Sequence, residues 1–269
     1  MKTLKIYPSF LCPFSCSFCY FKNIISLNEF LSLESLKEIL SNNKSNIKNI
    51  IITGGEPMNL PKEYFNNLID LIKQYNTNIT VESYPYTLSN YRDDIKYNFS
   101  YDFMIRPRAM DVWENLLRFP KKFDLTITLS PLMFRYHPNA LLQKLSLLPN
   151  VQNVEFIPYF KNKNSQFDIT KNQSLTKLNK LILSSKLNIP FTLINKEKLR
   201  SKILGIDIST DEVCIFPNSK LYYPTFENEI YSFIETTNDI FTQNTTLIYP
   251  DNIDMYSAEI VQWSKENGI

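Results

Sequence analysis

From the N-terminus to about residue 160, short runs of β-branched and apolar residues alternate with longer stretches of helical period. This alternation is typical of βα units around a parallel sheet. Six such units predict an α/β fold, a partial (β/α)6 TIM-like barrel. The strands that the pattern predicts are 4–9, 50–53, 79–83, 103–106, 125–129 and 154–158. The helices that it predicts between them are 33–41, 62–74, 90–97, 110–118 and 139–147.

The periodicity weakens after residue 160. Residues 161–174 are polar and rich in Asn, which favours a loop, and the helical pattern returns at 175–186. Residues 213–223 predict a hairpin that turns at 217–219, and residues 255–265 predict a terminal amphipathic helix. We therefore expect a barrel core over 1–160 and a short C-terminal extension over 161–269, packed on the barrel as one structural unit.

Composition and charge exclude several classes of partner. Apolar residues make up 43% of the chain, which is enough for a sizeable core, and the formal net charge is only +2. Because basic and acidic residues are mixed along the chain, we expect neither nucleic-acid nor membrane binding. No apolar run is long enough to span a bilayer, and the N-terminal residues do not resemble a signal peptide. The expected location is the cytoplasm.

Three of the four cysteines lie within eight residues, directly after the first predicted strand: Cys12, Cys16 and Cys19. Thiolates at this spacing on one loop can hold an iron–sulfur cube, in which each iron normally takes one Cys ligand. Three ligands leave one iron open for a substrate. A structural zinc site needs four ligands, and His137 and Cys214 are both distant in the sequence, so zinc is a minor alternative. A disulfide framework and chance clustering of free cysteines are also weaker readings.

A second motif, Thr53-Gly54-Gly55-Glu56-Pro57, ends the second predicted strand. The chain has only 4 glycines, and two of them are adjacent here, whereas average usage of ~7% would give roughly nineteen. Adjacent glycines let a backbone approach a ligand closely, and a neighbouring carboxylate can accept hydrogen bonds from an ammonium group. An ordinary turn between strand and helix is the alternative.

With both motifs in place, the chain resembles the radical S-adenosylmethionine (SAM) superfamily, CxxxCxxC type. The resemblance implies that the three cysteines hold one [4Fe-4S] cluster, whose open iron binds the amino and carboxylate groups of SAM. It places Gly54, Gly55 and Glu56 along the methionine amino group, with Pro57 in the same cofactor-binding segment, and Phe18 against the adenine. Ser83 and Arg106, at the ends of the third and fourth predicted strands, are where relatives reach the ribose or the carboxylate.

The resemblance also implies an activity. An electron from a reduced flavodoxin or ferredoxin would enter the cluster, the sulfonium C–S bond would break, and a 5′-deoxyadenosyl radical would abstract hydrogen from a substrate. The first hypothesis is a peptide substrate, made on the ribosome, and a small-molecule substrate is also open. The alternatives are an activase of a glycyl-radical enzyme and a non-catalytic iron–sulfur protein.

The C-terminal segment from Cys214 to Pro224 resembles a remnant of the cysteine-rich extension of peptide-modifying relatives. One cysteine cannot hold another four-iron cluster, so we expect a single cluster. Cys214 is better explained as a buried small hydrophobe than as a catalytic thiol, and His137 as structural or exposed. Core packing is likewise favoured over a substrate pocket for five aromatic residues: Tyr159, Phe160, Tyr222, Tyr223 and Phe226.

Overall fold

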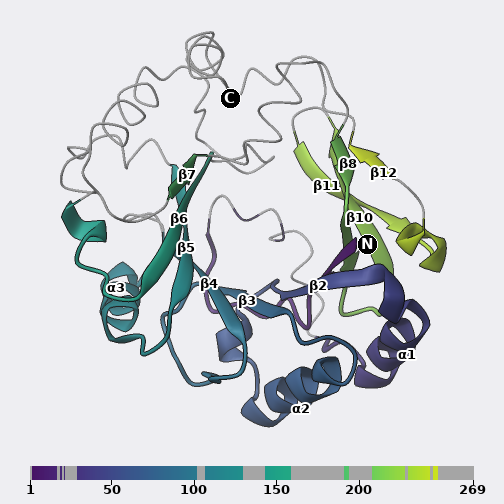
Figure 1. The fold of residues 1–269 in the computed structure, drawn as a ribbon, viewed down its shortest axis with the longest axis horizontal. Helices are drawn as coiled ribbons and strands as arrows, with labels where there is room; N and C mark the ends of the chain where they lie inside the picture. The colour runs from purple at the N-terminus through teal and green to yellow at the C-terminus, as the bar shows by residue number, and fades with distance from the viewer. Residues whose placement is uncertain are drawn as a thin grey trace, which may run out of the picture.

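The computed structural model of the protein describes residues 2–16, 19, 21, 29–101, 107–129, 143–158, 191–193, 208–227, 230–242 and 245–247. Ten strands in these residues form one sheet, in the spatial order β11-β10-β9-β1-β2-β3-β4-β5-β6-β7. All neighbours from β9 to β7 are parallel, whereas β10 is antiparallel to both β9 and β11. Figure 1 shows the sheet bent into an arc with β7 and β11 at its ends. The α/β fold with a partial barrel is thus confirmed.

The strands of this sheet come from nearly the whole chain. Their bounds are β1 Lys2–Ile6, β2 Ile47–Ile52, β3 Ile79–Ser83, β4 Lys96–Tyr101, β5 Phe123–Leu129, β6 Val151–Pro158, β7 Phe191–Leu193, β9 Glu212–Ile215, β10 Leu221–Glu227 and β11 Ile230–Thr236. A separate antiparallel pair joins β8 (Ile208–Thr210) to β12 (Thr245–Leu247). The sheet therefore includes strands from both sides of residue 160.

The α-helices whose full length the structure describes lie outside the arc of strands: α1 (Leu33–Asn43), α2 (Lys62–Lys73) and α3 (Ala109–Arg118) (Figure 1). Each buries one apolar stripe against the sheet, as its 3.6-residue period predicts; in α2 this stripe is Phe65, Leu68, Ile69 and Ile72. Ser32 caps the start of α1 by accepting a hydrogen bond from the Ser35 N–H at 3.3 Å. Three short 3-10 helices are η2 (Lys44–Asn46), η3 (Pro57–Asn59) and η5 (Asn238–Phe241).

The connection between β3 and β4 differs from the sequence prediction, because it contains no helix. The predicted helix 90–97 is wrong: residues 84–95 contain only turns and bends, and β4 already begins at Lys96. Tyr97, Phe99 and Tyr101 are buried at every second position, which is the period of a strand. The predicted strand 103–106 lies outside the described residues. Of the predicted helix 139–147, residues 139–142 lie outside them, residues 143–145 are helical and residues 146–147 form a turn.

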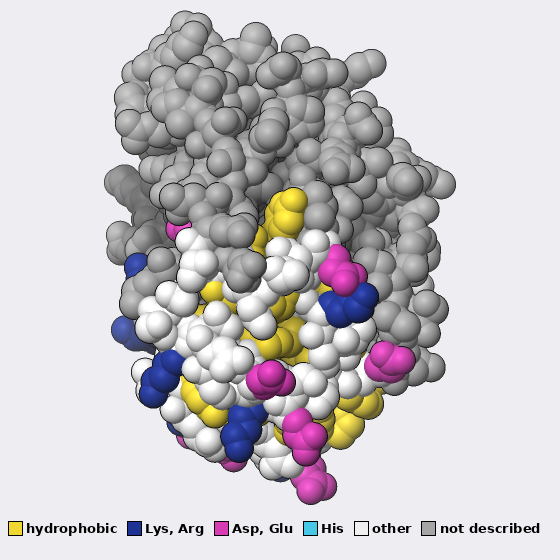
Figure 2. All heavy atoms as spheres, turned by 90° about the vertical axis from the view of Figure 1, so that its right-hand side faces the viewer, with side chains coloured by type: hydrophobic (Ala, Val, Ile, Leu, Met, Phe, Trp, Pro, Cys, Tyr) yellow, Lys and Arg dark blue, Asp and Glu magenta, His cyan; other side chains and the backbone are white. Residues whose placement is uncertain are grey.

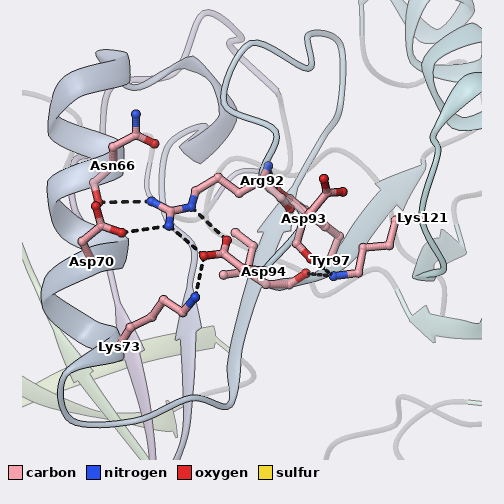
Figure 3. A network of polar contacts seen from close by, with 9 residues as sticks. Asn66, Asp70, Lys73, Arg92, Asp93, Asp94, Tyr97 and Lys121 are labelled. Carbon is pink, nitrogen blue, oxygen red and sulfur yellow. Dashed lines mark hydrogen bonds and ion pairs between the residues drawn. The ribbon is translucent and has the colours of Figure 1, made fainter.

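A network of charged groups holds the helix-free connection (Figure 3). The Arg92 guanidinium donates to both oxygens of Asp94, at 2.9 and 2.7 Å, and to Asp70 of α2 at 2.8 Å. Lys73 adds an ion pair to Asp94 at 2.5 Å, and Lys121 donates to the Ile95 carbonyl at 2.7 Å. These bonds tie the connection to α2 and to the chain before β5, in place of the packing that a helix would supply.

The predicted hairpin at 213–223 is confirmed, since Leu221 and Tyr222 of β10 pair with Ile215 and Cys214 of β9. The structure adds that β9 lies parallel to β1, more than 200 residues earlier in the chain. The predicted helices 175–186 and 255–265 lie outside the described residues.

No helix in the described part of the chain is both long enough and apolar enough to cross a membrane. On the face that Figure 2 shows, acidic and basic side chains are scattered among each other over the described residues, which matches the mixed charge of the sequence.

Candidate functional site

The two sequence motifs meet at the carboxyl ends of β1 and β2. Because these strands are parallel neighbours, the loops that follow them leave the same edge of the sheet. Hydrogen bonds join the loops directly: the N–H of Gly55 donates to the Ser9 carbonyl at 3.0 Å, and that of Glu56 to the Leu11 carbonyl at 3.0 Å. The Gly54–Pro57 segment is therefore held against the cysteine loop.

Both glycines are required by this contact. A Cβ atom on Gly55 would lie 2.1 Å from the Leu11 carbonyl oxygen, which is far inside van der Waals contact. Gly54 has a φ of +119°, a conformation that residues with a side chain rarely adopt. The sequence predicts that the glycines let the backbone approach a ligand. In the structure they let the backbone approach the cysteine loop.

The three cysteines are half-buried on this loop. The Cys19 N–H donates to the Cys16 carbonyl at 3.1 Å. Cys12 and Cys16 pack against the main core, whereas Cys19 packs against a second apolar cluster. Burial raises the pKa of the Cys12 thiol to about 11, and the nearby Glu56, Cys16 and Cys19 contribute to this increase.

Three thiols on one loop are the ligand set of a four-iron cluster with one open iron. Among the described residues, no three His, Cys, Asp or Glu side chains converge on one metal position. In a four-iron cluster each thiolate binds a different iron, so the ligands need not converge on one point. A bound metal would also keep the thiols deprotonated in spite of their burial.

Glu56 is buried at the junction of the two loops and the end of β3, with 3% of its surface exposed. Its carboxylate accepts hydrogen bonds from the Ser83 hydroxyl, from the Tyr84 N–H at 2.9 Å and from the Met58 N–H at 3.1 Å. Ser83 and Glu56 are both predicted site residues, and the structure brings them into contact. Pro57 is buried beside them and begins η3.

An aromatic residue of the cysteine loop packs against two aromatic residues that follow β3, none of which is predicted from the sequence as a site residue. The ring of Phe14, between Cys12 and Cys16, meets Tyr84 and Tyr86 edge to face, with centroids 5.3 and 4.8 Å away. The available signal was the Tyr-Pro-Tyr run directly after a strand that ends near the motifs.

Tyr86 is a charge-coupled side chain of this site. Arg108, just before α3, places its guanidinium carbon 5.1 Å from the Tyr86 ring centroid. Burial raises the pKa of Tyr86, with further contributions from Glu56 and Cys12, and Arg108 opposes the increase. The phenol therefore lies near enough to both motifs to sense their charges.

Cys214 lies on β9 and is completely buried. Its apolar cluster contains Tyr7, Phe10, Phe21 and Phe216, with Cys19 packed against it. Burial raises the pKa of the Cys214 thiol to about 12, so the thiol is protonated at neutral pH. This environment is that of a small hydrophobic residue.

The remaining predicted residues are not all visible in the structure. Phe18, Arg106 and His137 lie outside the described residues, as do Tyr159 and Phe160. Tyr222 is partly buried and stacks on Phe216 with centroids 4.2 Å apart.

Comparisons with known proteins agree with this arrangement. The family model described as Radical SAM superfamily matches residues 6–106. Among solved structures, SuiB of Streptococcus suis bound to S-adenosylmethionine is 15% identical with a TM-score of 0.59, over 81% of this chain and 59% of SuiB. SuiB was also solved bound to its precursor peptide SuiA. Native anSMEcpe with bound AdoMet is 15% identical with a TM-score of 0.61, over 82% of this chain and 73% of that one.

These likenesses show a shared fold. The chain spans only about three fifths of the length of SuiB. No curated protein matches the chain by sequence.

Proposed function

We propose that the chain, whose residues 6–106 match the Radical SAM superfamily model, is an iron–sulfur enzyme that cleaves SAM reductively. The observation that supports this most directly is the hydrogen-bonded contact of the cysteine loop with the Gly54–Pro57 segment. This contact joins the loop that carries the proposed cluster ligands to the segment that we assign to SAM. The carboxyl ends of the strands are also where barrel enzymes keep their sites.

The proposed roles follow the motifs. Cys12, Cys16 and Cys19 ligate one [4Fe-4S] cluster, and the Gly54–Pro57 segment lies along the methionine part of SAM. When bound, the reduced cluster supplies the electron that splits the sulfonium C–S bond into methionine and a 5′-deoxyadenosyl radical, which takes a hydrogen atom from the substrate.

The other positions complete the cofactor site. Phe18 packs against the adenine, and Ser83 and Arg106 reach the ribose or the carboxylate of SAM. A reduced flavodoxin or ferredoxin supplies the electron, and the reaction takes place in the cytoplasm.

We propose a peptide as the substrate. SuiB was solved with its precursor peptide, and anSMEcpe with the Cp18Cys peptide. Both share the fold of this chain over about four fifths of its length. The test uses peptides encoded close to the gene, synthesised with deuterium on carbon. Transfer of deuterium to 5′-deoxyadenosine supports a peptide substrate, and a product without label contradicts it for those peptides.

The first experiment addresses the cofactor chemistry. The protein is reconstituted anaerobically with iron and sulfide, and then receives dithionite and SAM. We expect about four irons per chain and 5′-deoxyadenosine by mass spectrometry. Cys16→Ala should lose both, whereas the matched control Cys214→Ala should keep the iron. An intact cluster that yields no nucleoside would leave a non-catalytic iron–sulfur protein as the better reading.

A further inference from the structure

The buried carboxylate of Glu56 joins three parts of the site. We propose that Glu56 is a positioning residue: through Ser83 and Tyr84 it fixes the Gly54–Pro57 segment relative to the end of β3, and through Phe14 this arrangement fixes the cysteine loop. This inference rests on the proposed function. It assigns the carboxylate a role in positioning the two loops, beside the place of the Gly54–Pro57 segment along the methionine part of SAM.

Three groups of the protein donate hydrogen bonds to the Glu56 carboxylate. An ionised carboxylate only accepts hydrogen bonds and has about four positions for them. Three are taken by Ser83, Tyr84 and Met58, and the side chain is almost completely buried. A buried charge is stable only when its hydrogen bonds are made. The donors therefore hold the carboxylate, and the carboxylate holds the two backbone N–H groups in return.

A series of contacts leads from Tyr84 to the cysteine loop. The Tyr84 backbone is bound to Glu56 at 2.9 Å, and its ring packs edge to face on Phe14. Phe14 is separated by one residue from Cys12 and by one from Cys16, and it is 8% exposed. A displacement of the β3 end would therefore displace Phe14 and the two thiols beside it.

The connection between β3 and β4 also holds η3, which directly follows the glycine motif. The Ser89 hydroxyl donates to the Met58 carbonyl at 2.8 Å, and the Asn90 amide donates to the Leu60 carbonyl at 2.8 Å. The helix-free segment 84–95 thus contacts both motif loops. The cluster is expected on one loop and SAM along the other, and a misplacement of about 1 Å between reacting groups can cost a hundredfold in rate.

The variant that tests this is Ser83→Ala, because it removes one donor to Glu56 without changing any charge. The first measurement needs no cofactor: the rate at which iodoacetamide alkylates Cys12 in metal-free, reduced protein, followed by mass spectrometry. We expect an increase of about fivefold, because the cysteine loop loses its support. Phe14→Leu breaks the same path at its other end and should give a similar increase.

The second measurement is the SAM dissociation constant of the cluster-loaded protein. Ser83→Ala and Glu56→Gln should each raise it about tenfold. The dissociation constant of the double variant should be no higher than that of the single variant that binds SAM more weakly, because both changes break the same connection. Asn43→Ala is the matched control, since it loses a buried hydrogen bond in α1, 2.9 Å long and away from the site. It should change neither measurement.

Two results would overturn the proposal. If Ser83→Ala weakens SAM binding but leaves Cys12 alkylation unchanged, the hydrogen bond from Ser83 to Glu56 does not support the cysteine loop. If Asn43→Ala raises alkylation as much as Ser83→Ala does, the effect is general loosening. Failure of the proposed function looks different: wild-type protein with a full cluster would not bind SAM, while the alkylation rates would still report on Glu56.

Discussion

At the scale of single residues, the glycine motif shows how a functional signature can serve the contact between two loops. The Gly55 Cα faces the backbone of Leu11, so the smallest added side chain would meet a carbonyl oxygen. The backbone there cannot move aside without breaking the hydrogen bonds of Gly55 and Glu56. The absence of a side chain at this position is therefore a packing requirement.

Gly55→Ala should separate the two loops. We expect the free energy of unfolding to fall by about 2–4 kcal/mol, from the loss of two hydrogen bonds and from strain. Urea denaturation of the metal-free protein measures this, and iron content after reconstitution should fall as well. Asn42→Ala, on the exposed face of α1, is the control and should stay within about 0.5 kcal/mol of wild type. An unchanged midpoint for Gly55→Ala would show that the loops do not touch in solution.

At the scale of elements, the connection between β3 and β4 replaces a helix with an ion network (Figure 3). Hydrogen bonds from Arg92, and then from Lys73, hold the pKa of the Asp94 carboxyl below its usual range. A lowered pKa means that the folded state favours the charged form. Stability from this carboxylate is therefore present above the unfolded pKa of about 4 and is lost as the pH falls below it.

Asp94→Asn should thus destabilise the protein by about 1 kcal/mol at pH 7, a small value because solvent screens this half-exposed group. The difference from wild type should shrink as the pH falls below about 4, because protonation of the same carboxyl then stabilises the unfolded state of the wild-type protein. Urea titrations across this range measure the effect. Asp124→Asn, on β5, serves as the comparison. A difference that stays constant with pH would mean that the charge of Asp94 does not matter.

A second consequence at this scale concerns Arg92, whose guanidinium binds both oxygens of Asp94. Lysine cannot reproduce this two-point geometry. Arg92→Lys should therefore recover less than half of the stability that Arg92→Ala loses, as measured by thermal unfolding at pH 7. Full recovery by lysine would indicate that only the positive charge is needed.

At the scale of the whole molecule, β9 makes the C-terminal region part of the barrel sheet. Val213, Cys214 and Ile215 are fully buried where β9 pairs with β1. The cysteine loop follows β1 directly, and the Tyr7 N–H donates to the Ile215 carbonyl at 2.9 Å. The position of the loop therefore depends on residues near the other end of the chain.

Ile215→Asp should unfold the sheet as a unit, because a buried charge without a partner costs about 3–5 kcal/mol. Thermal unfolding followed by circular dichroism and by tyrosine fluorescence should give one shared transition at a lower temperature. Lys220→Ala, in the exposed turn of the same hairpin, should leave the transition in place. Two separate transitions would show that the hairpin folds independently of the barrel.

Much of the fold followed from local sequence. The α2 and β3 ranges were predicted to within one residue, because their apolar spacing is strict and their ends are marked by Pro61 and by polar residues. The prediction of a helix at 90–97 is wrong. It depends on a helical spacing of apolar residues across a segment that contains Asn90, Asp93 and Asp94. The Asn90 amide donates to the Leu60 carbonyl and the Asp94 carboxylate accepts from Lys73, both distant in the sequence, whereas Asp93 accepts from nearby Tyr91.

The sequence by itself determined the chemistry of the motifs, because ligand type and spacing are local properties of Cys12, Cys16, Cys19 and the Gly-Gly-Glu run. Only the tertiary structure decided which groups face them. The pairing of β9 with β1, the contact of Gly55 with Leu11, and the hydrogen bonds of Ser83 and Tyr84 to Glu56 all join residues that are distant in the chain. Such contacts leave no local pattern, because they depend on how the parallel strands align at one edge of the sheet.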